Sequence, residues 1–191
     1  KTTGGRWPTS GIVPLSKTLD TPGLLARRAG DLAFAFAALD PMICRRGVRM
    51  PDIPNLSDLT LGVPDSFFWE DCSPGIAETV EASLKQLESA GARLVKFELS
   101  GLATVHSMLL KGGVAAPELA AFIREELPDY RSSLDPVVAA RLRKAEGLPA
   151  WEYIQRRALI DRLSAQAAEE LSTVDALLTP TVTLTPPTVS S

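Results

Sequence analysis

The sequence predicts an α/β protein with a mixed sheet, a parallel strand–helix–strand unit and flanking helices. Segments 59–63 and 95–99 alternate apolar residues with small or polar ones, which is typical of short strands. Between them, residues 76–87 place four apolar side chains on one helical face, namely Ile76, Val80, Leu84 and Leu87. A crossover of this kind joins parallel strands, so we expect the two strands to pair in parallel.

The central helix carries signals for its own ends. Ser73 is expected to be the N-cap, and Pro74 to occupy the first helical position, where its missing N–H costs nothing. Gly91 follows the last apolar position, where helices commonly end at a glycine.

The N-terminal segment, residues 1–28, is rich in Gly, Pro, Ser and Thr and predicts an ordered loop with a turn at 20–23. A helix is expected from about Ala29 to Leu39. Because it is apolar on all sides, we expect it to be buried. Residues 41–58 contain three prolines and predict a connecting loop.

The second half of the chain is mainly helical. Segments 101–127 and 135–146 predict helices broken by glycines and prolines, and a long helix is expected over about 149–171. Val174–Leu178 is a further apolar strand, ended by Pro180. A length of 191 residues is typical of one domain, so we expect a single domain over 1–191.

Composition excludes several classes of protein. Hydrophobic residues make up 45% and charged residues 23%, as in ordinary globular proteins. The longest apolar run, 32–39, is far shorter than the roughly 18 residues that span a bilayer. A net charge of −3 gives no basic excess for nucleic acid, so neither a membrane nor a nucleic acid is expected as a partner.

Metal-binding and reactive residues are few. His106 is the single histidine; it is adjacent to Ser107, and neighbouring helical positions do not face each other, so a packed or pocket-lining role is favoured over a general base. Cys44 and Cys72 fit no zinc spacing and favour free thiols in a reducing compartment, although one disulfide stays open. We therefore expect a cytoplasmic protein with no metal and no cofactor.

Residues 1–11 read K-T-T-G-G-R-W-P-T-S-G, and residues 16–27 read S-K-T-L-D-T-P-G-L-L-A-R. This pair of segments resembles the amidase signature family. There, a K-P-T-x-G-R-x-P/S-x-x-G segment leads into S-x-x-L-D-x-x-G-P-x-A-R and then a buried helix. The positions that match in register are Lys1, Thr3, Gly5, Arg6, Gly11, Leu19, Asp20, Gly23, Ala26 and Arg27. Residues 174–181, V-D-A-L-L-T-P-T, are similar to the family's V-D-x-L-L-T-P-T strand, and the helix before it, with Tyr153 and Arg157, also fits.

Three features depart from the family pattern. Thr2 and Leu24 replace the usual prolines. The S-N-L-x-R-Y-D-G stretch of tRNA-dependent amidotransferase A subunits is absent around residues 112–130, which favours a free-standing amidase.

The resemblance implies hydrolysis of carboxylic amides by a Ser–cis-Ser–Lys triad. The lysine, the G-G-S-S-G-G segment and the G-x-D-x-G-G-S-x-R nucleophile segment belong before the position of Lys1, and a Gly-rich stretch belongs after the T-P-T strand. We therefore expect an interior segment of an amidase, a partial amidase signature fold over 1–191. Such a segment would hold no catalytic residue and would be inactive alone.

Five residues are expected to bind substrate. Variable helices line the pocket in the family, so the helical region 104–116 is expected to cover the acyl side, with His106, Met108 and Leu109 as candidates. Thr179 and Pro180 follow a strand, and ligands lie at the carboxyl ends of strands in α/β sheets.

Two other functions stay open. The chain could be a non-catalytic α/β binding or scaffold module, or an A-type amidotransferase subunit. The partners expected for an amidase are a small amide substrate and the remainder of the amidase chain or a companion chain; a homodimer is left open.

Overall fold

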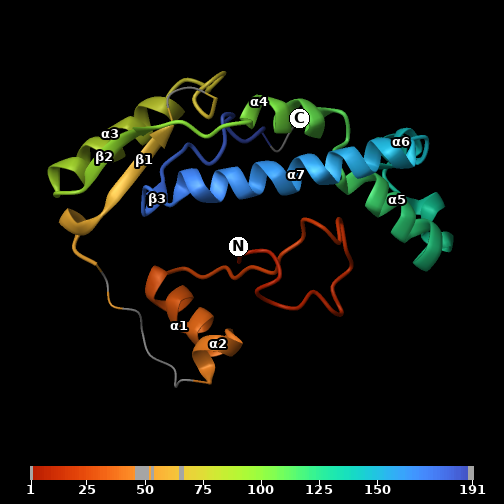
Figure 1. Cartoon of the computed structure of the whole chain (residues 1–191), viewed down its shortest axis with the longest axis horizontal. Coiled ribbons are helices and arrows are strands. Elements are labelled where there is room, and N and C mark those ends of the chain that lie inside the picture. Colours follow the sequence, from red (N-terminus) through yellow and green to blue (C-terminus); the bar gives the residue numbers. More distant parts are fainter. Residues whose placement is uncertain (1, 46–51, 53, 65–66, 189–191) are drawn as a thin grey trace. The chain divides into compact units, whose positions relative to one another are not determined.

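A computed structural model describes residues 2–45, 52, 54–64 and 67–188 (Figure 1). The chain divides into two compact units. The first contains Lys1–Ile53 and Met108–Arg157, and the second contains Pro54–Ser107 and Ala158–Ser191. Lys1, the first position of the family resemblance, lies outside the described residues, as do 46–51 and 53 of the expected connecting loop.

The second unit contains a three-stranded parallel sheet in the order β2-β1-β3. Strand β1 (Thr60–Pro64) pairs with β2 (Arg93–Phe97), so that Gly62 lies opposite Val95. Strand β3 (Ala176–Leu177) pairs with the other edge of β1, with Gly62 opposite Leu177. The parallel strand–helix–strand unit is thus confirmed. Over the described residues both pairings are parallel, where a mixed sheet was expected.

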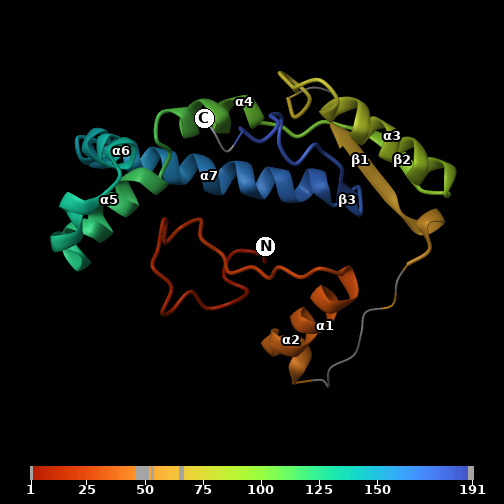
Figure 2. The same ribbon diagram turned by 180° about the vertical axis from the view of Figure 1, so that it is seen from behind.

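Helix α3 (Ile76–Ser89) connects β1 to β2 and lies beside them in both views (Figures 1 and 2). It begins two residues later than expected, because Gly75 has a φ of 90° and interrupts the helical backbone. Gly75 is therefore the N-cap in place of Ser73, and its N–H donates to the Glu78 carboxylate over 2.9 Å. Gly91 follows the helix end as expected, with a φ of 107°.

The second unit also contains a short turn before the sheet and a helix after β2. The 3-10 turn η1 (Leu56–Asp58) precedes β1, and helix α4 (Leu102–Leu110) follows β2, with its last residues in the first unit. Asp175 joins β3 to the start of β1, because its carboxylate accepts a hydrogen bond from the Thr60 N–H over 2.7 Å.

The first unit contains two groups of helices. Helices α1 (Ala29–Leu39) and α2 (Pro41–Cys44) follow the N-terminal segment. Helix α5 (Ala115–Glu126), the 3-10 turn η2 (Pro128–Ser133) and helix α6 (Pro136–Glu146) form the other group. Helix α7 (Ala150–Leu171) contributes its first two turns to this unit and the rest to the second.

Helices α5 and α6 share a small hydrophobic core. Ala120, Ile123 and Leu142 are buried together, and Phe122 and Val138 pack against them. Asp135 caps α6, because its carboxylate accepts the Val137 N–H over 2.8 Å, and Pro136 occupies the first helical position.

Helix α1 has the expected bounds but not the expected burial. Phe36 stacks on the Trp7 ring with centroids 5.4 Å apart, and Ala37 is buried. Phe34 and Leu39, however, are 57% and 60% exposed. Within the described residues, only one side of this apolar helix finds packing partners, which is why the prediction of full burial is wrong here.

The close packing of Gly62 gives a test of the sheet. A Cβ at this position would lie 2.8 Å from Leu177 Cδ2 and 3.1 Å from Phe97 Cβ. We expect Gly62→Ala to lower the unfolding free energy of the full-length protein by about 1–3 kcal/mol through overpacking, measured by thermal or urea unfolding.

The matched control is Gly30→Ala in α1, where an added Cβ meets no atom within 4 Å. Alanine favours a helix over glycine by roughly 0.5–1 kcal/mol, so this change should leave stability equal or higher. Equal stability of Gly62→Ala and the unaltered protein would contradict the packing of β1 between its neighbours.

Candidate functional site

Residues 2–22 contain no helix and no strand, and their two ends are joined. We call this segment the N-terminal loop. The N–H and the hydroxyl of Thr2 both donate to the Pro22 carbonyl, over 3.4 and 3.0 Å. The conformation between these ends is fixed by side chains, above all by two carboxylates of the first unit, Asp40 and Glu118.

Asp40 holds the first part of the loop. Its Oδ2 accepts hydrogen bonds from Arg6 Nε over 2.6 Å and from Trp7 Nε1 over 3.1 Å. Its Oδ1 accepts the N–H groups of Met42 and Ile43, so Asp40 is also the N-cap of α2. The side chain is fully buried, so water does not reach it. The protein donors to both carboxylate oxygens take the place of water.

Phe36 makes apolar and cation–π contacts with the two loop residues that donate to Asp40. Its ring stacks on Trp7, and the Arg6 guanidinium lies 5.2 Å from the ring centroid. The loop is thereby attached to α1 by charge, hydrogen bonds and ring packing together.

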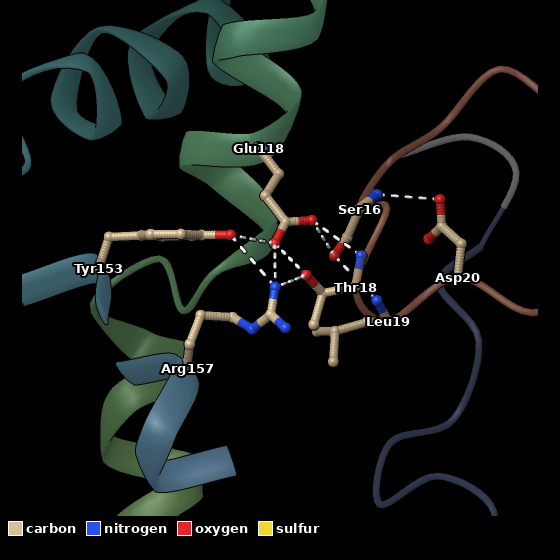
Figure 3. A network of polar contacts seen from close by, with 7 residues as sticks. All are labelled: Ser16, Thr18, Leu19, Asp20, Glu118, Tyr153 and Arg157. Carbon is tan, nitrogen blue, oxygen red and sulfur yellow. Dashed lines mark hydrogen bonds and ion pairs between the residues drawn. The ribbon is translucent and has the colours of Figure 1, made fainter. Parts of the chain in front are cut away.

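Glu118 on α5 holds the last part of the loop (Figure 3). Its Oε2 accepts hydrogen bonds from Ser16 Oγ over 2.8 Å and from the Thr18 N–H over 3.0 Å. Its Oε1 accepts the hydroxyls of Thr18 and Tyr153, the latter over 2.7 Å. We call Ser16, Thr18, Glu118, Tyr153 and Arg157 the Glu118 network.

Helix α7 completes the Glu118 network. Arg157 Nη1 donates to Thr18 Oγ1 over 2.6 Å and lies 3.9 Å from Glu118 Oε1. Tyr153 is one helical turn before Arg157, so the two side chains reach the same carboxylate from one face of α7. One carboxylate thus connects the loop to two helices.

Both carboxylates are held in the ionised form. The pKa of Asp40 is lowered to about 2, because the hydrogen bond from Arg6 and those from Trp7, Ile43 and Met42 outweigh the opposing effect of burial. Burial also raises the pKa of Glu118, but hydrogen bonds from Thr18, Tyr153 and Ser16 outweigh it and leave this pKa below its ordinary value.

The last part of the loop is also stabilised by hydrogen bonds within itself. Asp20 Oδ2 accepts the N–H groups of Leu15 and Ser16, over 2.8 and 2.9 Å. The Ser16 carbonyl in turn accepts the N–H groups of Leu19 and Asp20. Residues 15–20 therefore form one hydrogen-bonded turn that ends two residues before Pro22.

The candidate substrate-binding residues lie in both units. In the second unit, His106 is exposed and contacts the Phe67 ring edge-on, with centroids 5.2 Å apart. Thr179 is half-buried and Pro180 is buried, just after β3. In the first unit, Met108 is buried and Leu109 is exposed. A role in substrate binding stays a prediction for each of the five.

The sequence motifs do not identify Asp40 or Glu118 as site residues. Asp40-Pro41 carries a recognisable signal, an N-cap acid before a proline at the first helical position. For Glu118, the sequence carries no such local signal, because its partners Ser16 and Thr18 are about 100 positions away.

Metal and redox features are limited in the described part of the chain. No group of three or more His, Cys, Asp and Glu side chains among residues 2–45, 52, 54–64 and 67–188 could hold a metal ion. Cys44 and Cys72 are free thiols. In the same residues, no helix combines the length and the apolar character needed to cross a membrane.

The chain belongs to the Amidase family, whose model matches residues 1–191. It is 46% identical to a 2-amino-5-chloromuconic acid deaminase of Comamonas testosteroni over 98% of this chain and 40% of that protein. It is 30% identical to an indoleacetamide hydrolase of Rhizobium radiobacter over 66% of this chain and 26% of that protein. The predicted family is thus confirmed.

Solved structures show the same fold. A crystal structure of an amidase superposes on the whole of this chain and 42% of its own length, with a TM-score of 0.82 at 23% identity. The chain therefore spans about two fifths of the length of that amidase and of the Comamonas relative.

The depressed pKa of Asp40 gives a pH test of the loop attachment. A carboxylate with a lowered pKa stabilises the folded state above its unfolded pKa of about 3.9, and this stabilisation is lost as the pH falls toward 2. We expect Asp40→Asn to lower the thermal midpoint of the full-length protein by several degrees at pH 7, with a smaller difference from the unaltered protein near pH 2.5.

Asp129→Asn is the control, because Asp129 is exposed at the start of η2. Its midpoint should follow that of the unaltered protein over the whole pH range. A difference between Asp40→Asn and the unaltered protein that stays constant from pH 7 to pH 2.5 would contradict the assignment.

Proposed function

We propose that this chain is part of an amidase that hydrolyses a carboxylic amide to the acid and ammonia or an amine. The observation that carries the proposal is the match of the Amidase family over residues 1–191. The superposition on a solved amidase over the whole chain supports it at the level of the fold.

The chemistry proposed is acyl transfer through a Ser–cis-Ser–Lys triad in the amidase sequence before Lys1. A neutral lysine, favoured by burial, would remove the proton of the bridging serine, which in turn takes the proton of the nucleophile. The serine oxygen then bonds to the amide carbon, the proton taken up by the lysine passes to the amide nitrogen, and the C–N bond breaks to release ammonia or the neutral amine. Water then hydrolyses the acyl-enzyme ester to the acid and restores the serine hydroxyl. Glycine-rich backbone N–H groups would hold the oxyanion.

The contribution of residues 1–191 is the scaffold and part of the pocket. The N-terminal loop, held by Asp40 and Glu118, would support the segment that carries the nucleophile. His106, Met108, Leu109, Thr179 and Pro180 are proposed to contact the substrate. The free thiols Cys44 and Cys72 favour a reducing compartment, and we place the protein in the cytoplasm.

A second candidate reaction is ammonia release from an unsaturated 2-amino acid. It is favoured by the 46% identity with a protein named 2-amino-5-chloromuconic acid deaminase. Both reactions break a C–N bond and release ammonia, so one assay separates them by substrate.

The test measures ammonia release by the full-length protein from propionamide, indole-3-acetamide and 2-amino-5-chloromuconic acid. We expect turnover of at least one amide, abolished when the proposed nucleophilic serine is replaced by alanine. Turnover of the amino acid alone would favour the second reaction. An absence of ammonia release and of labelling by a serine-reactive fluorophosphonate would contradict both and favour a non-catalytic module.

Substitution of Leu109 tests the proposed pocket. Its side chain is 51% exposed on α4, and loss of an apolar contact to substrate is worth about 1–3 kcal/mol. We expect Leu109→Ala to lower kcat/KM about tenfold for the amide turned over fastest. Leu110→Ala, next to it on the same helix, is the control. Equal kinetics of both variants and the unaltered protein would remove Leu109 from the pocket.

A further inference from the structure

We propose that Glu118 is a positioning residue for the C–N bond hydrolysis of this protein. Its ionised carboxylate fixes residues 16–20, and through them the closed N-terminal loop, in the conformation that supports the nucleophile. This inference rests on the proposed function, and it assigns a role to a side chain that belongs neither to the triad nor to the candidate pocket residues.

The first argument is that the surroundings of Glu118 require an acceptor on both oxygens. The Thr18 N–H faces Oε2 and can only donate. On the other oxygen, the Thr18 hydroxyl already accepts from Arg157, so its own proton is directed at Glu118. A glutamine would place an NH2 group against one of these two sides, and the donors there would lose their acceptor.

The second argument is burial. The Glu118 side chain is only 11% exposed, so water cannot readily replace a lost acceptor. Several donors converge on this carboxylate, and their hydrogen bonds keep it charged in spite of its burial. A side chain that served only to cover the surface of α5 would not need such surroundings.

The third argument is the route from Glu118 to the start of the chain. Residues 15–20 form one turn, because Asp20 accepts two N–H groups within it. Pro22 follows this turn and accepts two hydrogen bonds from Thr2. A shift of the turn therefore reaches Thr2 across a direct contact, and under the proposed function the nucleophile segment lies just before Lys1.

The expected effect is on the chemical step more than on binding. Misplacement of a reacting group by about 1 Å can lower the rate about a hundredfold. We expect Glu118→Gln in the full-length protein to lower kcat about ten- to hundredfold, while KM changes less than about threefold. The rate of covalent labelling by a fluorophosphonate, in which the serine oxygen bonds to phosphorus and fluoride leaves, should fall by a similar factor.

Glu125→Gln is the matched control. Glu125 is exposed on the same helix, and the same chemical change there should leave kcat, KM and the labelling rate unaltered. Tyr153→Phe removes a single hydroxyl that donates to Glu118, and we expect a smaller fall in kcat in the same direction, about threefold. If circular dichroism shows that Glu118→Gln does not fold, the kcat of Tyr153→Phe tests the proposal instead. An unchanged kcat in this variant would then overturn it.

The outcomes separate the two proposals. Full kcat and full labelling rate in folded Glu118→Gln, with an active unaltered protein, would overturn the positioning role and leave the proposed function in place. A rise in KM with unchanged kcat would also overturn it, because it would assign Glu118 to binding. An unaltered protein that neither releases ammonia nor reacts with the fluorophosphonate would overturn the proposed function itself.

Discussion

The N-terminal loop depends on two carboxylates, the fully buried Asp40 and the largely buried Glu118. Residues 2–22 have no helix or strand and only a few backbone hydrogen bonds of their own, so side chains supply much of what fixes them. Asp40 binds the loop at Arg6 and Trp7. Glu118 binds it at Ser16 and Thr18 (Figure 3). Burying a charge is costly unless donors surround it, and here the loop itself supplies several of these donors. Loss of a carboxylate therefore leaves the loop's donors without an acceptor. Loss of the loop conformation leaves the carboxylate without those donors.

This arrangement joins the family assignment to the chemistry proposed for the protein. The chain belongs to the Amidase family, and the loop begins at the position where the family resemblance places the end of the nucleophile segment. A serine nucleophile must be held close to its base and to the oxyanion donors. Under the proposed function, the closed N-terminal loop with its internal hydrogen bonds would provide that rigidity, and the triad would supply the bond-breaking groups. The five candidate pocket residues would then determine which acyl group is accepted.

The sequence predicts those parts of the fold that depend on local patterns. The apolar spacing of 59–99 predicts the parallel unit, and the strand near 174–178 is found at the other edge of β1. The start of α3 was missed because Gly75 adopts a positive φ, which no apolar period reveals. Glu118 was missed because its partners are distant in sequence, and its Ala-rich surroundings indicate only a helix. The exposed side of α1 shows a further limit of prediction from sequence. An apolar helix predicts burial, but the sequence of the helix does not identify the segment that covers it.

Hydrogen–deuterium exchange over residues 16–21 tests most directly whether Glu118 fixes the loop. In this turn the Thr18 N–H donates to Glu118, and the Leu19 and Asp20 N–H groups donate to the Ser16 carbonyl. The account predicts slow exchange in the full-length protein and at least about tenfold faster exchange in Glu118→Gln, with α3 peptides unchanged in both. Equal exchange of this segment in the two proteins would contradict the account, because the loop would then hold its conformation without the carboxylate.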